Sequence, residues 1–157
     1  LGAAPQGDGL SGVHSHMSNS LNTPVEALEH AYPFRVVHYG IRRGSGGAGV
    51  HTGGDGLRRD IQLLCPGRVT LLSERRLQGP RGVAGGEDGA TGENVLIRKV
   101  SDGELPASPE NSSEESIAGR GMPAGEKRLP GKVTFDAKEG DIISIRSPGG
   151  GGWGKKG

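Results

Sequence analysis

The stretch FRVVHYGIR at residues 34–42 decides the fold, because the apolar period there changes from about three and a half residues to two. Successive side chains of an extended strand point to opposite sides. The alternation therefore predicts Phe34, Val36, His38 and Gly40 on one face and Arg35, Val37, Tyr39 and Ile41 on the other. Short runs of the same texture, bounded by Gly, Pro or Asp, follow at 57–64, 68–75, 94–100, 132–137 and 141–146.

Immediately before this stretch, NTPVEALEHAYP at residues 22–33 predicts one short helix near 24–31. Thr23 is a suitable N-cap, Pro24 suits the first helical position, and Glu26 completes a capping box with Thr23. Pro33 ends the run. A helix of about two turns is too short to be stable alone, so it must pack on an apolar surface.

Six strand runs and one helix predict a mainly β domain, a β-rich α+β fold with short mixed or antiparallel sheets. No helix-length segments separate the strands, which argues against parallel crossovers. We expect a flexible arm at 1–12, a single β-rich domain at 13–154 and a tail at 155–157. Residues 101–128, rich in Ser, Glu and Pro, are predicted to form a long exposed loop insertion.

The composition excludes several classes of protein. Gly (31) and Pro (10) make up 41 of the 157 residues, but the glycines have no period of three, which excludes collagen. A net charge of +1 argues against a disordered chain. No apolar run approaches 18 residues and no signal-peptide core lies near the start, so we expect a cytoplasmic protein with no membrane contact. The first residue is Leu, which suggests a piece of a longer polypeptide.

Charge and cysteine content add two further expectations. Residues 35–100 carry an excess of Lys and Arg, which suggests either a basic face for an anionic partner or solvated strand edges, and the second is more common. The basic residues are not interleaved with aromatics, so nucleic-acid binding is not expected. The single cysteine, Cys65, is expected to be a buried, inert thiol.

Each of two glycine-rich motifs has two possible structural interpretations. Residues 44–49 match G-x-G-x-x-G after a strand, but the glycines of VHTGGDGLRRD (50–60) leave no following helix to bind a pyrophosphate. A glycine connection that allows close approach of another backbone is the better interpretation. GGGGWG at 149–154 either lies against a partner or pocket, anchored by Trp153, or is a flexible tail.

His14-Ser15-His16 is the strongest chemical motif in the chain. Residues two apart on an extended segment face the same side, so both imidazoles could reach one metal ion or one substrate oxygen. Asn19 and Asn22 follow as potential orienting donors. No Cys or carboxylate lies at a tight ligand spacing, so a complete metal site is not encoded locally. Metal binding by this chain is therefore left open.

Six segments, taken in order, resemble the C-terminal part of the hydantoinase B/5-oxoprolinase family, which includes N-methylhydantoinase B-type subunits and the related acetone and acetophenone carboxylase large subunits. The segments are HSHMSNSLNTPVEALEHAYPFRV (14–36), GSGGAGVHTGGDGLRRDI (44–61), VTLLSERR (69–76), GVAGGEDGATGENVL (82–96), LPGKVTF (129–135) and IRSPGGGGWG (145–154). The resemblance covers nearly all of 12–154 except the acidic loop.

The resemblance implies ATP-dependent chemistry on a cyclic amide of the hydantoin or 5-oxoproline class, with a ketone carboxylase subunit or a non-catalytic assembly module as alternatives. It implies that an A-type subunit activates the substrate by phosphoryl transfer and that the B-type chain completes the reaction. It also implies that the metal-binding residues lie in a separate N-terminal B-type portion.

The expected protein is thus a C-terminal portion or small subunit that is inactive alone and works in a hetero-oligomer. The A-type ATPase subunit and the N-terminal B-type portion are its expected partners. ATP and a divalent metal are implied for the complete enzyme, and no cofactor is expected on this chain. The resemblance places His14, His16 and Asn19 near the active site as candidate catalytic residues.

Overall fold

A computed structural model describes residues 1–14, 22–98 and 125–155. These residues contain one short helix and seven strands: α1 (Val25–Ala31), β1 (Phe34–Arg42), β2 (Gly56–Leu63), β3 (Gly67–Leu72), β4 (Glu93–Ile97), β5 (Glu126–Leu129), β6 (Lys132–Ala137) and β7 (Ile142–Arg146). The mainly β fold class predicted from the sequence is confirmed. No helix in these ranges is long and apolar enough to cross a membrane.

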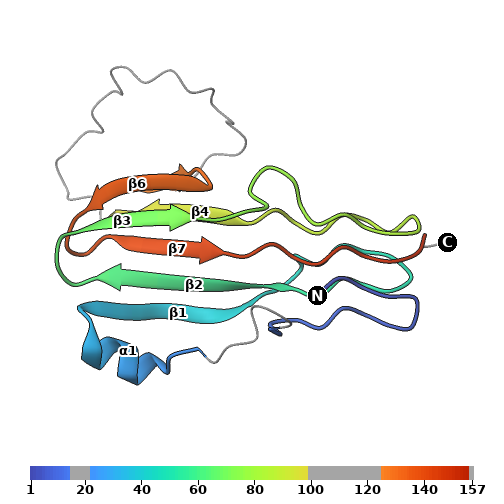
Figure 1. The fold of residues 1–157 in the computed structure, drawn as a ribbon, viewed down its shortest axis with the longest axis horizontal. Helices are drawn as coiled ribbons and strands as arrows, with labels where there is room; N and C mark the ends of the chain where they lie inside the picture. The colour runs from blue at the N-terminus through green and yellow to red at the C-terminus, as the bar shows by residue number, and fades with distance from the viewer. Residues whose placement is uncertain (15–21, 99–124, 156–157) are drawn as a thin grey trace, which may run out of the picture.

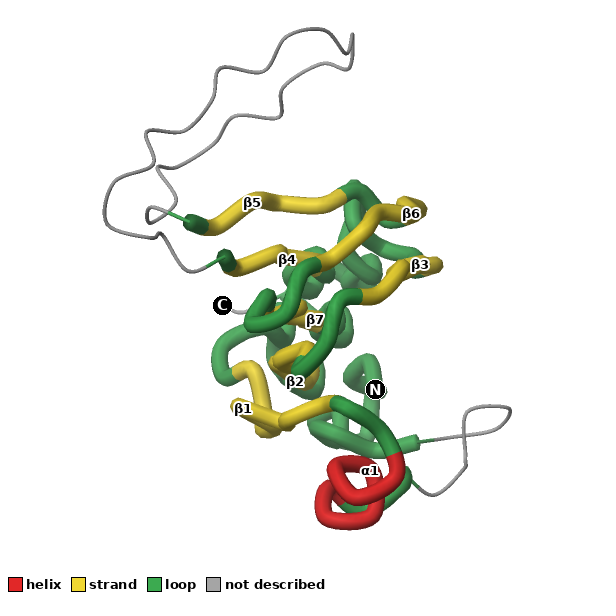
Figure 2. Tube along the Cα trace, turned by 90° about the vertical axis from the view of Figure 1, so that its left-hand side faces the viewer, coloured by secondary structure: helices red, strands yellow, loops and turns green. Residues whose placement is uncertain are grey.

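The strands form two antiparallel sheets (Figure 1). The larger sheet has the order β1-β2-β7-β4-β5, and β3 pairs with β6 in a separate ribbon. Figure 2 shows this ribbon beside the β4–β5 end of the larger sheet. A two-stranded ribbon is marginally stable alone, so it depends on packing against its neighbour.

A small aliphatic core joins the two sheets. Its buried members are Leu63, Leu96, Leu129, Ala137 and Ile143, and apolar side chains of β3 and β6 pack against them. At roughly 25 cal/mol per Å² of buried apolar surface, such a core supplies only modest stability. The β1 end of the larger sheet contributes few buried residues, and Tyr39 and Ile41 there are exposed.

The helix forms where it was predicted, but the predicted capping box is wrong. Pro24 occupies the N-cap position with φ −52° and ψ 145°, and no side chain caps the helix. Because the chain is still extended at Pro24, Thr23 is one residue too far out to bond the first helical turn. Instead the helix is joined to β1, where the Val36 backbone N–H donates to Glu29 Oε1 at 2.7 Å.

The predicted loop 101–128 extends too far at its C-terminal end, because β5 begins at Glu126. The sequence of β5 is EKRL, and only Leu129 is buried. This is an edge strand, and charged side chains are usual on sheet edges. Its composition therefore gave no apolar alternation to predict it from. Residues 99–124 lie outside the described part of the chain.

Beyond the ends of the large-sheet strands, four glycine-rich segments run side by side (Figure 1). They are residues 1–9, 44–55, 79–92 and 147–154. Almost none of their residues belongs to a strand, yet their backbones are extensively hydrogen-bonded to one another. Residues 1–12, expected to be a flexible arm, contribute bonds such as Ala3 N–H to Gly151 O at 2.9 Å.

The segment at 149–153 is the centre of this glycine-rich half. Its backbone is hydrogen-bonded to the chain at Ala3, Gly47, His51, Gly54, Val83, Glu87 and Ala90. Successive residues thus bond neighbours on several sides, as an extended chain with three residues per turn does and a flat strand does not. GGGGWG is therefore part of the folded body rather than a tail.

The close packing of these segments requires glycine at several positions. A Cβ atom at Gly149 would overlap the carbonyl oxygen of Ser45, and one at Gly152 would overlap that of Ala48. A Cβ at Gly53 would overlap the carbonyl oxygen of Gly150. The interpretation of the 44–49 motif as a connection that allows close backbone approach agrees with this packing, and β2 rather than a helix follows it.

The predicted burial of Cys65 is wrong. The thiol belongs to an exposed residue between β2 and β3, adjoining Pro66 and Gly67. Leu63 ends the buried part of β2, and Leu64 is already exposed. The turn carries the following residues away from the core, so the apolar neighbours of Cys65 in sequence do not enclose it.

Candidate functional site

A β-bulge in β1 decides which side chains meet near its C-terminal end. The register with β2 shifts between Val36 and His38, so Phe34 and Val36 share a face with Tyr39 and Ile41. The strict alternation predicted from the sequence is therefore wrong beyond Val37, because one extra residue reverses the sides that follow. We call this side of the larger sheet the Tyr39 face.

Across β2, the bulge places Tyr39 directly opposite Arg59. The guanidinium carbon of Arg59 lies 5.4 Å from the centroid of the Tyr39 ring. This distance is within the range of a favourable cation–π contact. Arg59 Nε is buried and has no hydrogen-bond partner among the residues that the structure describes.

The third member of the site reaches Tyr39 from the segment before the helix. Asn22 Nδ2 donates to the Tyr39 hydroxyl at 2.9 Å and lies 3.5 Å from His14 Nε2. For Asn22 to donate to that ring nitrogen, His14 must be the tautomer with its proton on Nδ1. We name His14, Asn22, Tyr39 and Arg59 the Tyr39 cluster.

Of the candidate residues predicted from the sequence, the structure places only His14, which is exposed. His16 and Asn19 lie outside the described residues. Asn22 was expected as an orienting donor, and its bond to Tyr39 fits that role. Tyr39 and Arg59 were not predicted, because only the bulge brings them to the same side.

The opposite face of the larger sheet carries a network of paired charges. Glu93 forms ion pairs with Arg42, Arg128 and Arg146 at 3.2, 2.9 and 3.0 Å. On β2, Arg58 donates through Nε to Asp60 Oδ1 and through Nη2 to Oδ2. The positive charges of the middle of the chain are here largely balanced by carboxylates. This network favours a structural role over an anion-binding surface.

A second carboxylate organises the start of the glycine-rich half. Asp55 Oδ1 accepts from the backbone N–H groups of Gly46 and Ser45 at 2.9 and 2.8 Å. The bond from Gly46, with those from Ser45 and Gly44, lowers the pKa of Asp55 below its ordinary value despite the opposing effect of partial burial. Asp55 therefore holds the 44–49 turn as a carboxylate.

Replacing Asp55 by Asn is expected to destabilise the fold by about 1 kcal/mol at pH 7, because two charge-assisted bonds weaken. A lowered folded pKa adds stability above the unfolded value of about 3.9 and loses it as the pH falls through the folded pKa. The difference between Asp55→Asn and the unchanged chain should therefore narrow below about pH 4, as measured by urea denaturation. A difference that is constant with pH would contradict this.

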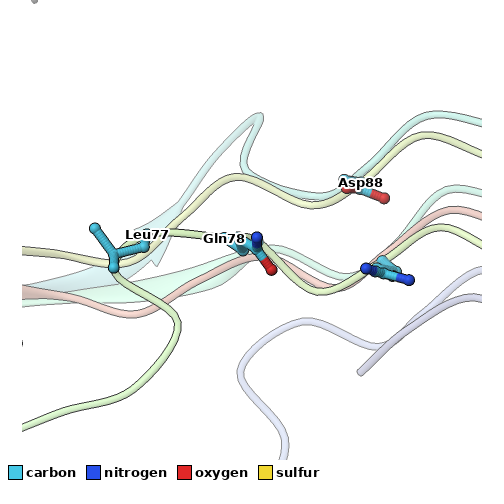
Figure 3. A pocket seen from close by; sticks show the side chains of 5 residues that line it. Leu77, Gln78 and Asp88 are labelled. Carbon is cyan, nitrogen blue, oxygen red and sulfur yellow. The ribbon is translucent and has the colours of Figure 1, made fainter.

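A shallow hollow of about 360 Å³ adjoins residues 77–88 and is lined by Leu77, Gln78, Gly79, Arg81 and Asp88. Figure 3 shows Leu77, Gln78 and Asp88 spread along the chain rather than converging on one point. Asp88 already accepts the Gly82 N–H at 2.8 Å, and Leu77 is 80% exposed. Small-molecule sites need a few convergent polar groups in an enclosed apolar wall, so the hollow is the weaker candidate.

Among the described residues, no group of three or more His, Cys, Asp or Glu side chains is placed to hold a metal ion. The G-x-G-x-x-G motif is followed by a strand, so it presents no helix N-terminus to a phosphate. The Tyr39 cluster offers an imidazole, an amide, a phenol and a guanidinium. These groups can orient and hydrogen-bond a carbonyl- or carboxylate-bearing ligand.

Comparison with known proteins gives a consistent picture. The sequence profile of the family described as Hydantoinase B/oxoprolinase matches residues 1–156. The chain is 40% identical over 156 residues to 5-oxoprolinase 1 of Arabidopsis thaliana. The matched region covers 98% of this chain and 10% of that protein. It thus spans about a tenth of the length of the first curated relatives it matches.

Two solved structures share the fold. The nucleotide-free structure of an acetone carboxylase superposes with a TM-score of 0.67 at 21% identity, over 98% of this chain and 22% of that one. An ATP-dependent caprolactamase from Pseudomonas jessenii superposes with a TM-score of 0.62 at 21% identity, over 88% of this chain and 21% of that one. In both, the same arrangement of strands forms a small part of a much longer chain.

Proposed function

The chain belongs to the hydantoinase B/oxoprolinase family, and we propose that it contributes to the active site of an ATP-dependent amidohydrolase that opens cyclic amides of the hydantoin or 5-oxoproline class. The observation that carries the proposal is the 40% identity to a protein named 5-oxoprolinase, which extends over 98% of this chain. The chain spans only a small part of such proteins. We therefore propose that it is not active alone.

The division of labour follows from the chemistry of amides. A ring amide is a poor electrophile, and transfer of a phosphoryl group to its oxygen makes the carbon easier to attack. We propose that a hydantoinase A-type ATPase subunit performs this step in a hetero-oligomer in the cytoplasm. We propose that the A-type subunit binds ATP and that the N-terminal B-type portion binds a divalent metal.

The role proposed for this chain is to hold and orient the substrate. His14 carries a ring nitrogen 3.5 Å from the Asn22 amide, and that amide is fixed by the Tyr39 hydroxyl. An imidazole can accept or donate a hydrogen bond at either ring nitrogen, and the contact with Asn22 orients the ring of His14. We include His16 and Asn19 as candidates for the same site, from their positions two and five residues after His14.

The test is ATP-dependent ring opening of 5-oxoproline and hydantoin by the assembled enzyme. The double change His14→Ala and His16→Ala is expected to lower kcat/KM by at least tenfold, because oriented polar contacts to the reacting group are lost. His30→Ala is the matched control, since His30 is an exposed imidazole at the end of α1, and it should leave turnover unchanged. Full activity of the double variant would refute the site assignment.

A ketone carboxylase is the second candidate, supported by the shared fold with acetone carboxylase. At 21% identity that likeness carries the fold and not the substrate. Bicarbonate-dependent consumption of acetone or acetophenone, with no turnover of cyclic amides, would favour it.

A purely structural module is the third candidate. It predicts that the double His change leaves the assembled enzyme fully active. Deleting residues 149–157 does not separate this candidate from the others, because the segment at 149–153 is hydrogen-bonded within the chain's own fold. The deletion would be expected to unfold the glycine-rich half whatever its function.

A further inference from the structure

Arg59 differs from the other partly buried arginines of the described chain. Each of those donates to a carboxylate, an amide oxygen or a backbone carbonyl: Arg42, Arg58, Arg76 and Arg146. Arg59 forms no hydrogen bond and no ion pair with any described residue, and its Nε is buried without a partner. Within the described part of the chain, the contact recorded for its charge is the ring of Tyr39, 5.4 Å from the guanidinium carbon.

A guanidinium that is partly removed from water without an acceptor is unfavourable, because its N–H donors lose hydration and gain nothing in return. Nε is the only Arg59 atom that is both buried and unpartnered, so the two Nη groups form its accessible edge. The Tyr39 ring lies 5.4 Å from the guanidinium carbon and restricts where the side chain can lie. The arrangement is therefore prepared for an acceptor that approaches the Nη edge.

We propose that Arg59 binds the carboxylate of a small cyclic-amide acid, the chemical class to which 5-oxoproline belongs. Two parallel N–H groups match the two oxygens of a carboxylate, and this pairing is stronger and more directional than a contact with lysine. Asn22 meets the hydroxyl end of Tyr39, with His14 next to it, and these two side chains offer partners for the amide of the same ligand. This proposal rests on the proposed function for the identity of the ligand, but its chemistry can be tested separately.

The experiment compares two ligands that differ only in the carboxylate. Binding of 5-oxoproline and of 2-pyrrolidone to the assembled enzyme is measured by calorimetry without ATP, so that no turnover is needed. Arg59→Gln is expected to weaken binding of 5-oxoproline by about tenfold or more, since a charge-assisted pair is lost. Binding of 2-pyrrolidone should not change. An equal effect on both ligands, or none on either, would overturn the proposal.

Two further variants separate recognition from folding and from long-range charge. Arg59→Lys keeps the charge but loses the fork, so it should bind 5-oxoproline with intermediate affinity and should fold even where Arg59→Gln does not. Arg35→Gln removes the same charge from an exposed position on the opposite face of the sheet, and it should bind both ligands normally. A loss of 5-oxoproline binding in Arg35→Gln equal to that in Arg59→Gln would contradict a specific contact.

The alternative partner for Arg59 is a carboxylate side chain from another part of the complete enzyme. In that case Arg59→Gln would lower the melting temperature of the assembled enzyme and affect both ligands alike, which overturns the proposal. Failure of the proposed function gives a different pattern. Carboxylate-selective binding that depends on Arg59 would then remain, while ATP-dependent ring opening would be absent.

Discussion

Gly149→Ala is expected to lower the free energy of unfolding by about 3 kcal/mol or more. A Cβ atom at this position would overlap the carbonyl oxygen of Ser45, which belongs to the backbone of a neighbouring segment. Overpacking of side chains costs about 1–3 kcal/mol because rotamers can adjust, but two backbones can separate only by breaking their hydrogen bonds. The Gly149 N–H donates to Ala90 O at 3.1 Å, and next to it the Gly47 N–H donates to Gly150 O at 2.8 Å.

Urea denaturation provides the measurement. With a slope of about 2 kcal/mol per molar urea, the loss corresponds to a midpoint lower by roughly 1.5 M. Gly67→Ala is the matched control, since nothing lies within 4 Å of the Cβ it would create and its φ is not positive. That change should be neutral or slightly stabilising, because it reduces the freedom of the unfolded chain. Equal midpoints for the two variants would refute the close packing.

Asp60→Ala is expected to cost about 2–3 kcal/mol. The residue is 3% exposed, and Arg58 donates to Oδ1 at 3.1 Å and to Oδ2 at 2.9 and 2.6 Å. Breaking a buried ion pair costs about 3–5 kcal/mol, but the Arg58 side chain is 38% exposed and can regain water, which reduces the effect. Asp136→Ala is the control, because its pair with Arg68 is 75% and 74% exposed and should contribute at most about 1 kcal/mol.

The same site carries a pH dependence. Burial acts to raise the pKa of Asp60, but hydrogen bonds from Arg58 and Ser144 and the charge of Arg58 outweigh it, so the pKa lies below its ordinary value. The pair thus stabilises the fold above the unfolded pKa of about 3.9 and ceases to do so as the pH falls through the folded value. The gap between Asp60→Asn and the unchanged chain should close in acid. A gap that widens there would contradict the pairing.

Much of the strand pattern could be predicted from sequence because it depends on neighbouring residues. Alternation located β1, β2, β3, β4, β6 and β7 to within a few residues, and Pro24 and Pro33 bounded the helix. β5 was not predicted, because an edge strand of Glu, Lys and Arg has no apolar face until a neighbouring strand supplies one. The capping box was wrong because its pattern does not state where the chain first turns helical.

The candidate site could be predicted only in part from the sequence. The pair His14 and His16 is a local motif, so spacing was enough to propose it. Tyr39 and Arg59 are twenty residues apart and meet through strand pairing. The bulge between Val36 and His38 decides on which face of the sheet they meet. The alternation pattern of β1 gives no sign of this bulge. Strict alternation predicts Phe34 and Tyr39 on opposite faces of β1, whereas in the structure they lie on the same face.

By itself, the sequence determined that this protein is built from short aliphatic strands with one short helix, since the strand period depends on adjacent side chains. Only the tertiary structure decided the strand order, the bulge and the reason for the glycines. Gly149 is required because Ser45, about a hundred residues earlier, passes against it. The absence of a Cβ has no consequence in an isolated segment. It becomes decisive only when a distant backbone occupies the space that the side chain would fill.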